Sequence, residues 1–324
     1  MKYKKKAAVL SALVAILGLV YILTFVTDAE RRRSPSFAWL DGSLLDHADR
    51  IEIYGVWGLT ALARKNGVWV YPVYSMDYPV KQARVEALLS ALSARLPYTP
   101  RGISSEGEER LGLSDRFASR IIIRGGAGLP LLELLVGDGD ALGREVYLKK
   151  AGRKEIYSGE DRFTLYVDSR PDSWYELRLF PAASGVYSGG SIHGSARMIS
   201  SSGTGIAAAM VQQVDVNFPG RQINYSLVRS GGSWELKGNT IQYFDLSRAD
   251  NWLDAILNTE AIDFSEEAPG HFVGSVTLHP GDGTSRTIYF CPVDGEETEW
   301  YAMQDDSPLV YILPKRAINR ILGE

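Results

Sequence analysis

Cysteine, histidine and excess positive charge are all scarce in this sequence. Its 324 residues include one cysteine, Cys291, which excludes an internal disulfide and any Cys-x-x-Cys metal or redox motif. The net charge of −4 argues against a nucleic-acid-binding protein that works by broad basic attraction. With 45% hydrophobic and 23% charged residues, wholesale disorder is also excluded, and the length favours two folded domains.

Motifs for nucleophilic catalysis or nucleotide binding are incomplete. The nearest approach to a G-x-S-x-G nucleophile elbow is residues 189–194, where His193 takes the place of the last glycine. Residues 203–208 fit a loose GxGxxA dinucleotide fingerprint, but they follow three serines instead of an apolar strand, and no acidic residue comes about 20 positions later. A flexible linker explains both stretches better, so we predict no catalytic and no cofactor-binding residues.

Metal ligands are equally sparse. The sequence has four histidines: His47, His193, His271 and His279. The last two would lie about 26 Å apart on an extended strand, too far to share an ion. Asp138-Gly139-Asp140 starts like a calcium loop, but Leu142 and Lys149 stand where oxygen ligands are needed. A solvated turn is the better interpretation, and no metal and no cofactor is expected.

The other side chains with chemical potential also have structural interpretations. Glu106-Gly107-Glu108-Glu109 and Asp305-Asp306 are predicted as surface charge in loops, without the apolar flanks that would raise a pKa. Cys291 ends an apolar stretch of a predicted strand, which favours a buried, inert thiol. Trp69 and Trp234 could stack a sugar or a peptide, but their matched positions in two halves of the chain favour the core.

One long apolar run stands near the N-terminus. Residues 7–26 read AAVLSALVAILGLVYILTFV, and at a rise of about 1.5 Å they span about 30 Å, the hydrocarbon core of a bilayer. Four lysines precede the run and three arginines follow it, which favours an N-terminus inside the cell. We predict a cytoplasmic tail (1–6) and a single transmembrane helix (7–26) in a bacterial inner membrane. A cleaved signal peptide is the alternative, and a buried soluble helix is a third interpretation.

The remainder of the chain is acidic. The four lysines fall before residue 27 and no acidic residue does, so residues 27–324 carry 31 basic and 39 acidic side chains, a net charge of −8. Such a part has no general attraction to anionic lipid headgroups. We therefore expect an extracytoplasmic body that stands off the membrane on a linker, residues 27–47.

The body contains an internal repeat. Alternating Ile51 and Ile53 lead to the glycine turn and tryptophan of residues 64–69, and Val214 and Val216 lead to those of residues 229–234. Each half continues with an amphipathic helix, paired strands around a glycine turn (121–137 and 276–292), two tyrosines ten residues apart and a short helical piece (161–167 and 315–322). Two unrelated α+β domains are the alternative.

The predicted fold class is α+β: an N-terminal transmembrane helix followed by two repeated, mainly antiparallel β-sheet units, each with a packed helix. The first repeat covers residues 48–180 and the second 210–324. Residues 181–209 between them form a linker, because 13 of the 25 residues at 181–205 are glycine or serine.

These features together resemble the bacterial DUF 4340 family, a domain of unknown function. The resemblance rests on the N-terminal helix, the I-x-I strand before a G-x-W turn, the amphipathic helix, and the G-x-x-x-Tyr strand from Gly143 to Tyr147 with Tyr157 after it. It covers most of residues 38–324 in two copies, and the second copy has Glu297 in place of Gly143. It implies an envelope protein associated with ABC transporters of the gliding-motility type, and it offers no catalytic residue to carry over.

The leading functional hypothesis is a non-catalytic, membrane-anchored envelope protein that acts as an accessory or scaffold subunit of such an ABC-type system. Its partners would be the membrane, through residues 7–26, and an envelope protein such as the ABC permease, but no nucleic acid. The alternative is an extracytoplasmic ligand- or glycan-binding module in which the two repeats act as a clamp. An enzyme with a site assembled from scattered residues is a third hypothesis.

Overall fold

The computed structural model of this chain describes residues 17, 35–74, 76–102, 105–180, 208–240, 245–267, 270–293, 296–305 and 307–323. The predicted cytoplasmic tail, the predicted transmembrane helix apart from Leu17, and the predicted Gly/Ser linker up to residue 207 lie outside the described residues. Among the residues that are described, no helix is long and apolar enough to cross a membrane.

The described chain is built mainly of antiparallel β-sheet with a few helices, so the α+β class is confirmed. It divides into two compact units. The first contains the described residues up to Arg64 together with Ala83–Pro171, and the second contains Lys65–Gln82 and the described residues from Asp172 onward.

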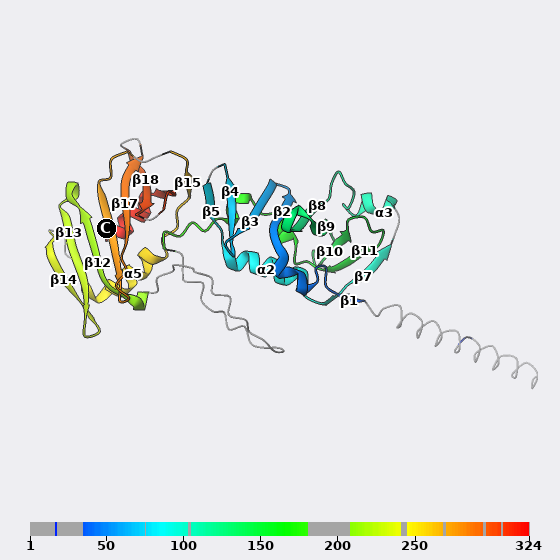
Figure 1. The fold of residues 1–324 in the computed structure, drawn as a ribbon, viewed down its shortest axis with the longest axis horizontal. Helices are drawn as coiled ribbons and strands as arrows, with labels where there is room; N and C mark the ends of the chain where they lie inside the picture. Colours follow the sequence, from blue (N-terminus) through cyan, green and yellow to red (C-terminus); the bar gives the residue numbers. More distant parts are fainter. Residues whose placement is uncertain are drawn as a thin grey trace, which may run out of the picture. The chain divides into compact units, whose positions relative to one another are not determined.

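The first unit holds a run of strands in the order β3-β2-β8-β9-β10-β11-β7 (Figure 1). These strands are β2 (Ala48–Gly55), β3 (Gly58–Lys65), β7 (Thr99–Gly102), β8 (Ser119–Gly125), β9 (Pro130–Gly139), β10 (Glu145–Lys150) and β11 (Ile156–Glu160). A separate short pair joins β1 (Ser36–Phe37) to β6 (Leu96–Pro97). The helices are α2 (Gln82–Ser93), α3 (Ser105–Arg110) and α4 (Thr164–Val167).

The second unit holds an eight-stranded sheet in the order β14-β13-β12-β16-β17-β18-β19-β15. Its strands are β12 (Val211–Phe218), β13 (Ile223–Ser230), β14 (Ser233–Thr240), β15 (Asp263–Ser265), β16 (Gly274–Pro280), β17 (Arg286–Val293), β18 (Glu296–Gln304) and β19 (Val310–Pro314). Its helices are α5 (Ala249–Leu257) and α6 (Lys315–Leu322). Figure 1 shows β12, β13 and β14 side by side, as their pairing requires.

The two sheets share a topology. The order β3-β2-β8-β9-β10-β11-β7 corresponds strand by strand to β13-β12-β16-β17-β18-β19-β15. The register agrees as well, because Ile51 lies opposite Ile123 in the first unit as Val214 lies opposite Leu278 in the second. The alternating apolar side chains that the sequence shows on these strands are the buried ones.

The glycine turns predicted at the two matched positions are both two-residue hairpin turns. Asn66 and Gly67 follow β3 with φ of 52° and 82°, and Gly231 and Gly232 follow β13 with φ of 58° and 90°. Two consecutive left-handed residues match the twist of the flanking strands, and glycine adopts that conformation without strain. The next strand, β4 (Val68–Val73) or β14, then buries its second residue, Trp69 or Trp234.

The amphipathic helices lie where the apolar spacing predicts them. Helix α2 buries Val85, Leu88 and Leu92 completely. Helix α5 buries Trp252 and Leu253 in a cluster with side chains of the second sheet, such as those of β12 and β16. Each unit is thus a sheet stabilised by burial of the apolar stripe of one main helix.

The boundary between the units differs from the predicted one. The hairpin of β4 and β5 (Met76–Pro79) and residues 172–180 belong to the second unit, although the predicted first repeat includes them. The reason is aromatic packing: Tyr78 lies 4.4 Å from the ring of Phe264 and 5.6 Å from that of Tyr175. Leu179 is buried in the same cluster, and its backbone N–H donates to the Thr259 carbonyl.

The predicted linker 27–47 is folded over its described part, and here the prediction is wrong. Phe37 lies on β1, Trp39 and Leu40 are buried, and residues Gly42–His47 form a 3₁₀ helix. The Leu40 N–H donates to the Leu92 carbonyl at the end of α2. Apolar side chains this large gain more from burial than a solvated linker would provide.

Candidate functional site

The connection between β7 and β8 lines a cavity of the first unit. It begins with α3, so Glu108 and Glu109 lie on a short helix and not in the predicted loop. The helix ends at Arg110, and Gly112 two residues later has a φ of 68°, the left-handed conformation that glycine favours after helix ends. The N–H of Gly112 donates to the Glu109 carbonyl, which closes the last turn.

The segment after α3 lies directly on β9. The N–H of Asp138 donates to the Leu111 carbonyl over 2.9 Å, and Leu113 is buried against Leu135 and Ile156. Gly137 makes this approach possible, because a Cβ atom there would lie 2.2 Å from the Leu111 oxygen and 2.9 Å from Leu113 Cγ. Because Gly137 has no side chain, the segment after α3 can lie directly against β9.

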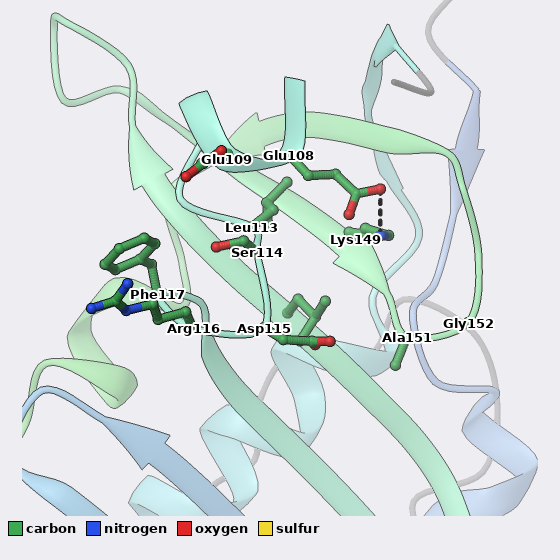
Figure 2. Close-up of a pocket in the computed structure, with 11 residues that line it drawn as sticks. Glu108, Glu109, Leu113, Ser114, Asp115, Arg116, Phe117, Lys149, Ala151 and Gly152 are labelled. Carbon is green, nitrogen blue, oxygen red and sulfur yellow. Dashed lines mark ion pairs between the residues drawn. The ribbon is translucent and has the colours of Figure 1, made fainter. Parts of the chain in front are cut away.

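The cavity formed in this way has a volume of about 590 Å³, within the range of about 300–1,000 Å³ that small-molecule sites occupy. Leu113 and Leu135 supply apolar lining, and both are buried. The lining residues are Glu108, Glu109, Leu113, Ser114, Asp115, Arg116, Phe117, Leu135, Lys149, Ala151 and Gly152 (Figure 2).

An ion pair lies at one end of the cavity. Glu108 Oε1 is 2.7 Å from Lys149 Nζ, and the side chains are 24% and 12% exposed. Figure 2 shows the two side chains pointing toward one another, Glu108 from α3 and Lys149 from β10. An ion pair that is largely withdrawn from water is sensitive to loss of either partner, because the remaining charge is left unpaired.

Ser114 offers an unused hydrogen-bonding group. Its Oγ atom is buried and has no hydrogen-bond partner among the described residues. Its carbonyl, in contrast, accepts from the N–H groups of Phe117 and Ala118, which fixes the turn. A buried hydroxyl without a partner costs free energy, and a ligand that reached it would recover that cost.

The rim opposite Lys149 in Figure 2 is aromatic and cationic. Phe117 is 60% exposed, and the Arg116 guanidinium lies 5.3 Å from its ring centre. Asp115 is in an ion pair with Arg120 over 2.8 Å, so its carboxylate is not free. The rim thus presents an apolar face and a cation to solvent.

The lining suits binding better than catalysis. It contains hydrogen-bond donors, an acceptor hydroxyl and an exposed ring, but its members include no histidine and no cysteine. Lys149 is in an ion pair with Glu108. The arrangement can hold a polar ligand that has an apolar face.

The corresponding connection of the second unit is shorter. The link between β15 and β16, residues 266–273, is half as long as the link of residues 103–118 between β7 and β8. At the register of Gly137 the second sheet carries Cys291, and at that of Lys149 it carries Met303. Gly137, which lets the connection approach the sheet, and Lys149, which places a charge in the cavity, therefore have different residues at their positions in the second unit.

Other residues singled out in the sequence lie elsewhere. Residues 189–194 and 203–207 are outside the described part of the chain, as is Asp306. Asp140 closes the turn between β9 and β10, and the N–H groups of Glu145 and Arg144 that donate to its carboxylate lower its pKa. Cys291 is a buried free thiol on β17, as predicted, and its burial raises its pKa.

A polar contact between β16 and β12 was not predicted from the sequence. His279 on β16 lies with Nε2 2.7 Å from Oδ2 of Asp215 on β12. Burial raises the pKa of Asp215, but hydrogen bonds from Ser226, Gln213 and His279 outweigh it and lower the pKa overall. Among the described residues, no group of three or more His, Cys, Asp or Glu side chains is arranged to hold a metal ion.

No family of known proteins, no curated protein and no solved structure matches this chain. The resemblance to the DUF 4340 family stays a prediction.

Proposed function

We propose that this chain is a non-catalytic, membrane-anchored envelope protein whose first unit binds a partner through the cavity between α3, residues 111–118 and β10. The observation that carries the proposal is the difference between the two units: they share a strand order, and the connection that is longer in the first unit lines a cavity of about 590 Å³. Loops added to a rigid scaffold are where proteins place binding functions.

The membrane anchor is part of this proposal. Residues 7–26 have the length and apolarity of a transmembrane helix, and the lysines before them favour a cytoplasmic N-terminus. The two units would then lie outside the cytoplasmic membrane. We further propose that the two halves of the chain are copies of one ancestral sequence, which the matched strand order, hairpin turns and tryptophans support.

The proposed partner is a protein of the envelope, and the resemblance to the DUF 4340 family suggests the permease of an ABC-type transport system. A polypeptide segment suits the cavity because its backbone supplies donors and acceptors for the Ser114 hydroxyl and the Lys149 ammonium, while an apolar side chain covers Leu113. The chain would act as an accessory or scaffold subunit.

The test is quantitative affinity purification of the tagged full-length protein from native membranes in mild detergent. The wild type should recover an ABC permease and ATPase in comparable amount. Lys149→Met, which installs the residue found at this register in the second unit, should lose most of that recovery. Lys237→Met, an equal change on the exposed surface of β14, is the matched control and should retain it.

Recovery that is equal for Lys149→Met and for wild type would contradict the role of the cavity. A protein that purifies alone in several detergents would contradict the accessory-subunit proposal as a whole.

A second candidate function is glycan binding at the same cavity, and the exposed ring of Phe117 favours it. An aromatic face beside a cation can stack on a sugar ring while the neighbouring polar groups bind its hydroxyls. A thermal shift with cell-wall fragments that disappears in Phe117→Ala would support this function. The clamp formed by two repeats stays a prediction.

A further inference from the structure

The path of the chain into the first unit limits how far this unit can stand from the membrane. The Tyr98 N–H donates to the Pro35 carbonyl, and Arg95 donates to the carbonyl of Ser36. The chain is thus held to the unit from Pro35 onward. Residues 27–34 alone connect it to the proposed anchor, and fully extended they span at most about 28 Å.

A second, smaller cavity opens beside this entry point. Its volume is about 300 Å³, and its lining residues are Phe37, Ala38, Trp39, Lys150, Arg153, Glu155 and Tyr157. Phe37 comes two residues after Pro35 and packs against Trp39 and Tyr157, with ring centres 5.0 and 5.1 Å apart. Tyr98 belongs to the same aromatic group, with its ring centre 5.1 Å from that of Trp39.

The polar side of this cavity is mainly cationic. Lys150 ends β10, and Arg153 follows in the turn to β11, where its N–H donates to the Lys150 carbonyl. Both side chains belong to exposed residues, and no carboxylate within the described part of the chain forms an ion pair with either of them. Glu155 is the one acidic member of the lining, so the cations exceed the acids by one.

These observations point to an anionic ligand at a membrane surface. Lysine and arginine together bind phosphate, arginine with two parallel hydrogen bonds. Tryptophan and tyrosine are enriched at the headgroup level of bilayers, where an apolar body and a polar edge are both satisfied. The body as a whole is acidic, so broad electrostatic attraction to anionic lipids would not bring it there.

We propose that the cavity beside Phe37 and Trp39 binds the phosphate of an anionic phospholipid headgroup and so holds the first unit against the bilayer. The inference rests on the membrane anchor of the proposed function. It replaces the expectation of a body that stands off the membrane on a long linker, because the linker is shortened to residues 27–34 by the folding of residues 35–47.

The experiment embeds the full chain in nanodiscs of phosphatidylcholine alone or with about one third phosphatidylglycerol, and measures hydrogen exchange by mass spectrometry. Peptides covering residues 148–157 should exchange more slowly in the anionic discs. Arg153→Gln should abolish this slowing. Lys154→Gln removes the same charge from the same turn but does not line the cavity, so it should retain the slowing.

The other outcomes each overturn a different statement. Equal exchange in both kinds of disc, with the protein embedded, overturns the headgroup site and leaves the anchor intact. Equal losses in Arg153→Gln and Lys154→Gln replace the site by general electrostatic attraction. The same slowing in detergent with inorganic phosphate alone assigns the cavity to a soluble anion. A chain that does not co-elute with nanodiscs overturns the anchor itself.

Discussion

The two units show how one sheet topology can be given different surfaces. Their strand orders agree, and a glycine turn and a buried tryptophan follow β3 and β13 alike, although the turn after β3 and Trp69 themselves belong to the second unit. They differ in the link that leads to β8 or to β16, where the first unit carries α3 and residues 111–118 and the second has a link of half the length. Both units are thus built on the same sheet topology, and the longer connection of the first unit lines a cavity.

A pair of core substitutions tests whether the units are equivalent where they look alike, and it should have the largest effect. Leu88 on α2 and Leu253 on α5 are both fully buried. Leu88→Ala and Leu253→Ala should each lower the free energy of unfolding by about 2–5 kcal/mol, since each leaves a cavity under a helix. Urea unfolding followed by hydrogen exchange measures the loss for each unit separately.

The exposed neighbours Glu86→Ala and Asp254→Ala serve as controls for these two helices and should change stability by about 0.5 kcal/mol or less. A small loss for only one of the two leucines would show that the helices do not stabilise their sheets in the same way.

A substitution in β9 tests the difference between the units. Gly137→Ala places a Cβ atom against the Leu111 carbonyl and Leu113, so it should cost about 1–3 kcal/mol and speed hydrogen exchange over residues 108–118. Gly139→Ala on the same strand is the control, because its Cβ would meet its nearest neighbour at an ordinary 3.7 Å. Unchanged exchange in Gly137→Ala would mean that the connection does not depend on this glycine.

Trp69 and Trp234 occupy matched positions but have different hydrogen-bond partners. Removing these partners should lower the free energy of unfolding by a smaller amount. Gln82 binds both the N–H and the carbonyl of Trp69, whereas Asp250 accepts from the Trp234 indole and from Arg229. Gln82→Ala should cost about 1–2 kcal/mol and Asp250→Ala about 1 kcal/mol, because the aspartate is the more exposed of the two. Denaturant midpoints measure both, and the reverse order would contradict the prediction.

The smallest expected difference between the units is in how the melting temperature falls at acid pH. Hydrogen bonds from Ser158 and then Arg101 lower the pKa of Glu145 on β10. A depressed pKa stabilises the fold above the unfolded value of about 4.3, and that stability is lost as the pH falls through the folded value. Glu145→Gln should therefore flatten the loss of melting temperature as the pH falls below the unfolded value of about 4.3.

Glu299→Gln is the matched control for the acid titration, since Glu299 takes the same register on β18. An equal flattening in both variants would assign the effect to net charge and not to the Ser158 and Arg101 contacts.

Strands and hairpins were predictable to a large extent because their signals are local. Alternating apolar residues such as Ile51 and Ile53 are buried on β2, and helix α6 begins and ends at the predicted residues 315 and 322. The elements that were missed are short. A two-residue strand such as β1 and a six-residue helix such as α3 are too brief to show a period in the sequence.

The candidate cavity could not be predicted for a different reason. Its ion pair joins residues 41 positions apart, Glu108 and Lys149, and nothing in either neighbourhood marks the other. Gly137 has no turn or positive φ to signal it, and it matters through the backbone that approaches it. The link 103–118 looks like surface charge until β9 and β10 are placed beside it.

The amino-acid sequence by itself determined the antiparallel α+β class, the hairpin turns, the helix faces and the parallel order of features in the two halves, because alternation, turn residues and helical spacing act over neighbouring residues. Only the tertiary structure decided that residues 35–47 fold onto the first unit, that residues 65–82 and 172–180 join the second, and that one connection forms a cavity. These outcomes depend on which apolar surfaces meet across the sheet, and burial of side chains distant in the chain is a property of the assembled fold.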